Sequence, residues 1–205
     1  MDLETGERFF AMLALLAAAG AVVVVVARLV PASRPLLAHL SPLARWLSFV
    51  VAATAMAGSL WFSESQGLEP CKLCWFQRVA MYSLAIVLLV AAIRRDRAAR
   101  WYVIPLAGAG IVVSIYHYLI EWHPEWEATS CSIAVPCSTP YFRAFDFVSL
   151  SFMAMCGFAA ILALTIFVPE EAPAEPYEEL DDLDQFDAEL DGAGDRDPIG
   201  EIGAH

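Results

Sequence analysis

Four of the five cysteines in the chain form two close pairs. Cys71 and Cys74 make a C-x-x-C motif, and five residues separate Cys131 from Cys137. Neighbouring thiols of this kind can exchange with a disulfide or bind a metal ion. Trp75 rather than a histidine follows the first pair, which excludes the C-x-x-C-H signature of covalent haem attachment. Redox exchange and metal binding are therefore the two chemistries that the cysteines permit.

The residues around the first pair favour redox chemistry. Lys72 lies between the two cysteines, and a helix is predicted to begin here, so a positive side chain and the positive helix end would both stabilise a thiolate. If the helix runs through the motif, Cys71, Cys74 and Arg78 fall at positions i, i+3 and i+7, on one face. Arg78 can then share a site with Cys74. The alternative is an arginine that extends its charge to the membrane surface.

The second pair lies in a segment of small polar residues with two prolines, from Thr129 to Pro140. This composition predicts an exposed loop that a partner protein could reach. A disulfide between Cys131 and Cys137 could also be a plain structural crosslink, which in so small a ring stabilises a fold by about 2–3 kcal/mol. The fifth cysteine, Cys156, is flanked by apolar residues and is predicted to pack as a small hydrophobic side chain.

The composition indicates which elements must hold these residues. Of the 205 residues, 59% are hydrophobic and 18% are charged, which is far from the balance of a soluble domain. The net charge of −12 comes from the end of the chain, because fourteen acidic residues and one arginine follow Pro169 and leave the remainder at +1. No basic patch is left for nucleic acid. We expect a membrane protein with an acidic, disordered tail.

Five stretches lack Asp, Glu, Lys and Arg, and a spanning helix needs about 20 such residues. The third stretch is short and must include the residues from Cys74 onward to cross the hydrocarbon. We expect the first stretch to be a retained helix rather than a signal peptide, because Asp2, Glu4 and Glu7 give its start the wrong charge. The five predicted spans are Phe9–Ala27, Trp46–Ser63, Val79–Ile93, Trp101–Ile120 and Phe147–Val168.

Arginines next to the spans predict the orientation, since short cytoplasmic loops are rich in Lys and Arg. The connection 94–100 holds four arginines and should be cytoplasmic. Arg28, Arg34 and Arg45 lie two crossings earlier and therefore on the same side. Both cysteine pairs then face away from the cytoplasm, where disulfides persist, and the acidic tail is cytoplasmic.

One histidine, His117, falls within a predicted span, near its outward end. An ionisable side chain in a span is costly and often functional. Aromatic residues around it mark the membrane interface, where a histidine can equally bind water or lipid headgroups. Both interpretations of His117 stay open at this point.

The stretch from Glu69 to Arg78, which reads EPCKLCWFQR, precedes a span and resembles the signature of the disulfide bond formation protein B family (DsbB, including its BdbC branch). The order of later features is also similar. A span, an arginine loop, a span that ends in His117, an outward loop with a second cysteine pair and a last span follow one another. The resemblance extends from about Leu43 to Pro169.

The resemblance implies an all-α membrane protein, with a four-helix transmembrane bundle of DsbB type and one additional N-terminal transmembrane helix. It divides the chain into an N-terminal helix with its connection (1–41), the redox bundle (42–169) and the acidic cytoplasmic tail (170–205). It places the protein in the bacterial cytoplasmic membrane. The implied activity is that of a thiol:quinone oxidoreductase, which reoxidises an extracytoplasmic DsbA-like thioredoxin-fold oxidase.

The resemblance also implies roles for single residues. Cys71 and Cys74 would be the pair next to the quinone, ubiquinone or menaquinone, with Cys74 as the thiolate that faces the ring. Arg78 and His117 would contact the quinone. Cys131 would be attacked by the partner's thiolate, and the mixed disulfide would be resolved by Cys137 and then Cys71. The extra helix, the tail and the short spacing of the second pair depart from the best-known form of the family.

Three other functions are consistent with the cysteines. The four could bind zinc or copper as a tetrahedral Cys₄ site, although Arg78 would compete with the metal ion for the thiolates. A quinone reductase of the vitamin K epoxide reductase type runs similar chemistry on four helices, but places its cysteines differently along the chain. A non-catalytic scaffold with two disulfides would leave Arg78 and His117 without a role. On the favoured interpretation, no metal is bound.

Overall fold

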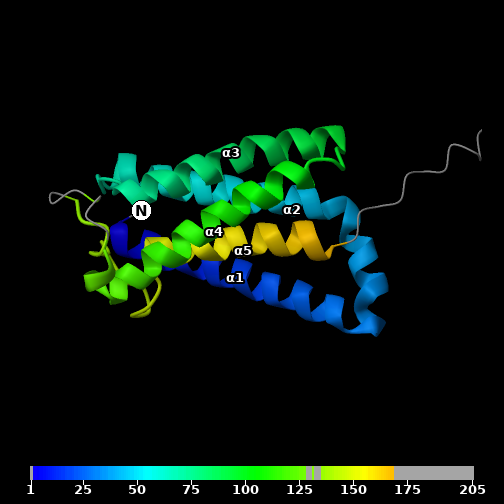
Figure 1. The fold of residues 1–205 in the computed structure, drawn as a ribbon, viewed down its shortest axis with the longest axis horizontal. Helices are drawn as coiled ribbons and strands as arrows, with labels where there is room; N and C mark the ends of the chain where they lie inside the picture. Colours follow the sequence, from blue (N-terminus) through cyan, green and yellow to red (C-terminus); the bar gives the residue numbers. More distant parts are fainter. Residues whose placement is uncertain (1, 128–130, 132–134, 169–205) are drawn as a thin grey trace, which may run out of the picture. The chain divides into compact units, whose positions relative to one another are not determined.

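The computed structural model describes residues 2–127, 131 and 135–168, and the predicted tail lies outside them. In the described part, five helices are long and apolar enough to cross a membrane, which confirms the five predicted spans and a multi-pass membrane protein. The helices are α1 (Leu3–Leu29), α2 (Arg34–Leu60), α3 (Lys72–Arg94), α4 (Arg100–Trp122) and α5 (Leu150–Phe167) (Figure 1).

Helices α2 to α5 form a four-helix bundle in which α2 and α4 each pack against both α3 and α5. Large apolar side chains fill its centre, among them Leu84 of α3, Val103 of α4 and Phe158 of α5. Helix α1 lies outside this bundle and packs mainly along α5 (Figure 1). The predicted all-α fold, with four bundle helices and one added N-terminal helix, is confirmed.

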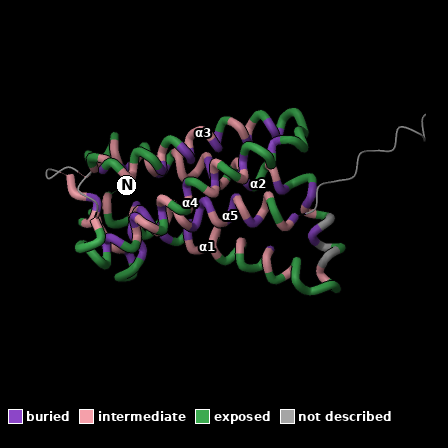
Figure 2. The backbone as a smooth tube through the Cα atoms, viewed as in Figure 1, coloured by how far each residue is buried: buried purple, intermediate pink, exposed green. Residues whose placement is uncertain are grey.

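The outer surfaces of the helices are exposed (Figure 2), and many of their side chains are large and apolar. Leu16, Val23, Ile86 and Val112 all have more than half of their surface accessible. A soluble protein rarely exposes so many large apolar side chains together. Lipid is the solvent that this surface fits.

The second helix begins earlier than predicted. Residues up to Arg45 were expected to form a cytoplasmic connection, but only a short 3₁₀ turn, Pro31–Ser33, joins α1 to α2. Pro35 lies in the first turn of α2, where a missing N–H costs nothing. Pro42 lies inside the helix, where proline bends a helix without ending it. The early part of α2 is steeply inclined to the rest of that helix (Figure 1).

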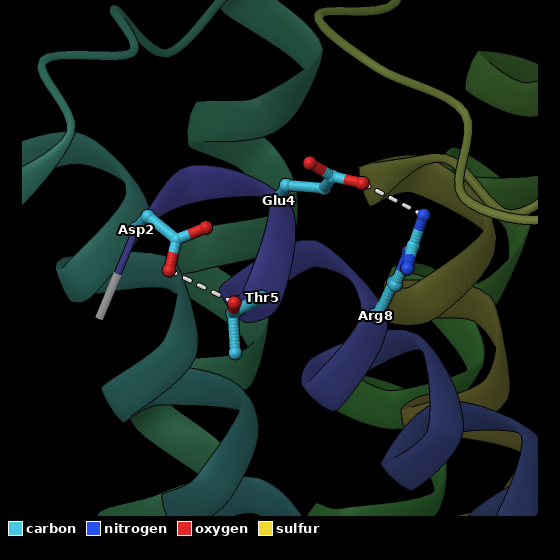
Figure 3. Close-up of polar contacts among 4 residues, drawn as sticks. All are labelled: Asp2, Glu4, Thr5 and Arg8. Carbon is cyan, nitrogen blue, oxygen red and sulfur yellow. Dashed lines mark hydrogen bonds and ion pairs between the residues drawn. The ribbon is translucent and has the colours of Figure 1, made fainter.

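The start of α1 carries its own local contacts. Thr5 donates to Asp2 at 2.9 Å, and Arg8 donates to Glu4 at 2.7 Å (Figure 3). The two acidic side chains lie at the positive end of the helix, which favours them. The Arg8–Glu4 pair is largely exposed and therefore stabilises the helix only slightly.

Close packing with glycines holds α1 against the end of α2. A Cβ atom added to Gly58 would lie 2.8 Å from the ring of Phe10, and one added to Gly6 would collide with the ring of Trp61. Phe10 also contacts Phe62, with ring centroids 5.5 Å apart. The two glycines therefore allow a close approach that no other residue would permit without a shift of these rings.

Candidate active site

The first cysteine pair lies where α3 begins. Cys71 is the N-cap residue of α3, and its Sγ accepts a hydrogen bond from the backbone N–H of Cys74 at 3.2 Å. The two sulfur atoms are 2.6 Å apart. The predicted stabilisation of a thiolate by the helix end therefore acts on Cys71 directly, because its sulfur takes the place of a capping oxygen.

Buried His117 contacts both cysteine pairs. Its Nε2 lies 3.7 Å from Sγ of Cys71 and 3.1 Å from the carbonyl oxygen of Cys137. Its Nδ1 lies 3.1 Å from Nε2 of Gln77, which is also buried. The imidazole therefore joins α3, α4 and the loop that carries the second pair.

The contacts of His117 indicate its tautomer. The carbonyl oxygen of Cys137 can only accept, so Nε2 of His117 is the donor there, and a hydrogen bond from the Gln77 amide to Nδ1 favours the same tautomer. The Nε2–H group points to Cys71 and to the carbonyl of Cys137. A hydrogen bond from the Cys74 thiol, followed by that of His117, lowers the pKa of Cys71 well below the usual thiol range.

The second pair forms a disulfide in the described structure, with Cα atoms of Cys131 and Cys137 6.0 Å apart. Cys137 is buried in one apolar cluster with Cys71 and Ile120, whereas Cys131 is partly exposed. Glu127 holds this segment through two contacts, since its carboxylate accepts from the backbone N–H of Cys137 at 2.8 Å and from the Ser138 hydroxyl at 2.5 Å. Cys131 is thus the more accessible cysteine of the pair, and Cys137 is buried in the cluster that contains Cys71.

A polar cluster fixes the ends of the loop between α4 and α5. The Ser151 hydroxyl donates to the buried carboxylate of Glu121 at 2.6 Å, and Ser149 caps α5. Arg143 donates to the backbone carbonyl of Glu121 at 2.8 Å and stacks on the ring of Trp122. These contacts hold the loop, and with it the second cysteine pair, against the bundle.

A cavity of about 420 Å³ lies beside the first pair, and Cys74 and Arg78 both line it. Arg78 donates to the backbone carbonyl of Ser59 on α2 at 2.9 Å, and its guanidinium lies over Trp75. A guanidinium has five N–H donors, so this contact fixes the group and leaves donors for a ligand. The volume falls in the range of small-molecule sites. An aromatic ring with carbonyl oxygens would fit the thiol and the cation together.

The structure separates the residues that the sequence grouped together. Cys74 and Arg78 face the cavity, as their spacing predicts, but His117 is not among the described residues that line it. His117 contacts Cys71 instead. Cys156 is buried within α5, in agreement with its predicted packing role.

The four cysteines do not converge on one point within the described residues. Cys71 and Cys74 group with His117, while Cys131 and Cys137 group with Glu127. Cys131 and Cys137 are joined in a disulfide, so their sulfur atoms are not the thiolates that a zinc site requires. This geometry disfavours the Cys₄ alternative.

Three site residues were missed by the sequence analysis. Gln77 and Glu127 have been described, and Tyr141 lines the cavity while its hydroxyl donates to the carbonyl of Glu69 at 2.6 Å. Gln77 could have been found, because a glutamine one residue before Arg78 at the start of a span is a polar group in need of a partner. Glu127 and Tyr141 lie in a loop without periodicity, which gave no signal.

Comparison with known proteins assigns the family. Residues 41–168 match the family described as Disulfide bond formation protein DsbB. Disulfide bond formation protein C of Bacillus subtilis (strain 168) is 41% identical over 118 residues, which cover 57% of this chain and 86% of that protein. The Probable disulfide formation protein of Oceanobacillus iheyensis (strain DSM 14371 / CIP 107618 / JCM 11309 / KCTC 3954 / HTE831) is 39% identical over 127 residues, covering 61% and 88%.

No solved structure matches the chain. The family match covers more than half of the sequence, and it begins within α2, so α1 lies before it. The matched region contains both cysteine pairs, Arg78 and His117. The chain is therefore a disulfide-forming membrane oxidoreductase, and it belongs to the DsbB family.

Proposed function

We propose that this protein reoxidises an extracytoplasmic thioredoxin-fold dithiol oxidase and passes the electrons through its two cysteine pairs to a membrane quinone. The observation that carries the proposal is the shared position of Cys74 and Arg78 on the wall of the cavity. A second disulfide lies beside the same pair, with one sulfur partly exposed. This arrangement has an aqueous entry, an internal transfer and an exit within the membrane.

The entry step is thiol–disulfide exchange at the second pair. A thiolate of the partner attacks Sγ of Cys131, which breaks the bond to Cys137 and releases the Cys137 thiolate. The second thiol of the partner then displaces Cys131, so the partner leaves oxidised and this pair is left with two electrons and two protons. Cys131 suits the attack because it is the more exposed of the two, and exchange requires access.

The transfer step takes the electrons to the first pair. The Cys137 thiolate attacks Sγ of Cys71 in the Cys71–Cys74 disulfide and releases the Cys74 thiolate, and Cys131 then closes the second disulfide again. Cys137 and Cys71 pack in one apolar cluster. The N–H of His117 faces Cys71, where it stabilises the developing negative charge of the sulfur.

The exit step needs an acceptor that is stronger than a protein disulfide, because DsbA-type oxidases have potentials near roughly −120 mV. A bound quinone supplies a two-electron, two-proton acceptor. Cys74 and Arg78 would hold it, with the thiolate on one side and the guanidinium as donor to a carbonyl oxygen. As the electrons leave, the disulfide between Cys71 and Cys74 forms again, and the chain returns to its starting state.

The orientation completes the proposal. The arginine-rich connection 94–100 lies at the far end of α3 from Cys71, so a cytoplasmic position of this connection puts both pairs outside. An impermeant thiol reagent should label Cys131 in reduced, intact cells and should leave a cysteine placed at Arg97 unlabelled. The reverse labelling would place the redox pairs in the cytosol and contradict the proposal.

The decisive experiment is a quinone reduction assay with a reduced thioredoxin-fold oxidase as the electron donor, with and without the purified protein. We expect catalysed reduction of quinone that depends on both donor and protein. A metal analysis of the same preparation separates the alternatives, since stoichiometric zinc without quinone reduction would support a metal site. Absence of catalysed reduction with ubiquinone and with menaquinone analogues would contradict the proposal.

A further inference from the structure

The cavity beside Cys74 continues away from the cysteines along α1, α2 and α5. At one end it is lined by polar side chains, including Cys74, Gln77 and Arg78. Farther along, the lining is apolar and comes from Leu13, Leu16 and Ala17 of α1. The same cavity thus has a polar end and an apolar groove.

The groove runs deep into the span. On α2 its lining extends from Ser59, which anchors Arg78, to Leu47. Twelve residues of helix correspond to about 18 Å, roughly half the thickness of a bilayer with its headgroup region. An occupant with a polar head at Cys74 and a long apolar tail fits this shape.

Helix α1 is held firmly enough to act as a wall. Gly6 and Gly58 let it approach the aromatic end of α2 closely, and Ala11 is fully buried in a cluster with Val148 near the start of α5. The region that matches the DsbB family begins at residue 41, so this wall lies outside the matched region.

We infer that α1 forms one side of a groove for the isoprenoid tail of the quinone, so that this added helix makes the protein select acceptors with a tail. The inference rests on the proposed function. It commits to the quinone tail rather than to a lipid chain, because the groove is continuous with the walls formed by Cys74 and Arg78.

The test uses two acceptors that share a head group: menadione, a naphthoquinone without a tail, and a menaquinone with a short isoprenoid tail. Ala17→Phe fills the groove from α1, whereas Ala19→Phe, on the exposed side of the same helix, makes the same change toward lipid. Dissociation constants are measured on the full-length oxidised protein by quenching of tryptophan fluorescence. Reduction of menadione reports that each variant is folded.

We expect Ala17→Phe to weaken binding of the tailed menaquinone about tenfold and to leave menadione binding unchanged, with Ala19→Phe like the unmodified protein for both. Equal effects of the two substitutions, or equal weakening of both quinones by Ala17→Phe, would overturn the role of α1 but not the quinone site. Equal affinity of the unmodified protein for both quinones would show that the groove holds lipid instead. Binding of neither quinone would overturn the proposed function together with the inference.

Discussion

The two cysteine pairs of this protein share one end of the bundle but differ in their surroundings. Cys71 and Cys74 lie at the start of a helix, where Cys71 contacts His117 and Cys74 lines a largely apolar cavity. Cys131 and Cys137 lie in a loop that the carboxylate of Glu127 holds. Rigid helices determine the position of the first pair, and local hydrogen bonds determine the position of the second.

On the proposed function, this difference would allow one chain to react with both a membrane-soluble acceptor and a protein partner. A membrane-soluble acceptor needs a dry, preformed site, and helices provide one. A protein partner needs an accessible sulfur, which a loop presents on the surface. Cys137 and Cys71 are buried in one cluster, which joins the two environments.

The largest expected effects come from removing one sulfur of each pair. Cys74→Ser should abolish quinone reduction while a mixed disulfide with the partner still forms at Cys131, because the exit is lost and the entry remains. Cys131→Ser should prevent capture of the partner, yet small dithiols should still reduce the Cys71–Cys74 pair. The rate of quinone reduction measures the exit step, and the amount of trapped mixed disulfide measures the entry step. Identical losses in both assays for both variants would contradict transfer between the pairs.

Substitutions of Arg78 test whether the electrons leave the protein at the cavity that Arg78 lines. A charge-assisted hydrogen bond contributes about 1.5–3 kcal/mol, so Arg78→Met should lower quinone turnover by roughly ten- to a hundredfold. Arg78→Lys should retain only part of the quinone turnover, since lysine keeps the charge but lacks the planar set of donors. Arg100→Met, at the other end of the bundle, is the control.

The kinetics should be measured over a range of quinone concentrations, with the state of both disulfides as the check on folding. Unchanged kinetics in a folded Arg78→Met protein would assign Arg78 to the membrane interface instead of the quinone.

The Gln77–His117 contact predicts a pH dependence confined to the first pair. The pKa of Cys71 is lowered, so its thiolate should persist as the pH falls from 8 to 6, where an ordinary thiol is protonated. Gln77→Leu removes a donor that favours this tautomer of His117, and should raise the thiolate midpoint by about one pH unit.

Thiolate absorbance of the reduced protein, relative to Cys71→Ser, measures this midpoint. Gln66→Leu serves as the control for loss of a glutamine near the same membrane surface. A midpoint that stays in place in Gln77→Leu would exclude a role of Gln77 in positioning His117.

The smallest effect should come from the loop. Glu127→Ala removes two hydrogen bonds from the segment that contains Cys137. The Cys131–Cys137 disulfide should then be held less firmly in one position, and the rate of mixed-disulfide formation with the partner should fall by roughly three- to tenfold. Reduction of the first pair by small dithiols should not change. Glu125→Ala removes a neighbouring, exposed carboxylate and should leave capture unaffected. Equal slowing by both would indicate a general effect of charge.

Most of the fold was predictable because lipid imposes a simple pattern on helices. The absence of charge located the five spans, and the C-x-x-C motif located the start of α3. The start of α2 at Arg34 was not predictable from charge, since arginines are compatible with a helix that reaches the membrane surface. Pro42 lies inside α2, where neighbouring helices can hold a bent helix together.

The site was predictable only where its residues share a helix. Cys74 and Arg78 face one cavity because a single periodicity relates them. The contact of His117 with Cys71 joins α4 to α3, and the contribution of Ala17 to the cavity joins α1 to the site. Such contacts depend on packing between helices, which the spacing of residues in a single sequence does not predict.

The close contact at Gly58 has a consequence for how this protein can vary in evolution. In a bundle without α1, position 58 would face lipid and could drift freely among apolar residues. Here the ring of Phe10 occupies the space that a side chain would need, so α1 places a constraint on a residue within the region that matches the family. Chains that have acquired such a helix should keep glycine at this position, and chains that lose the helix should release it.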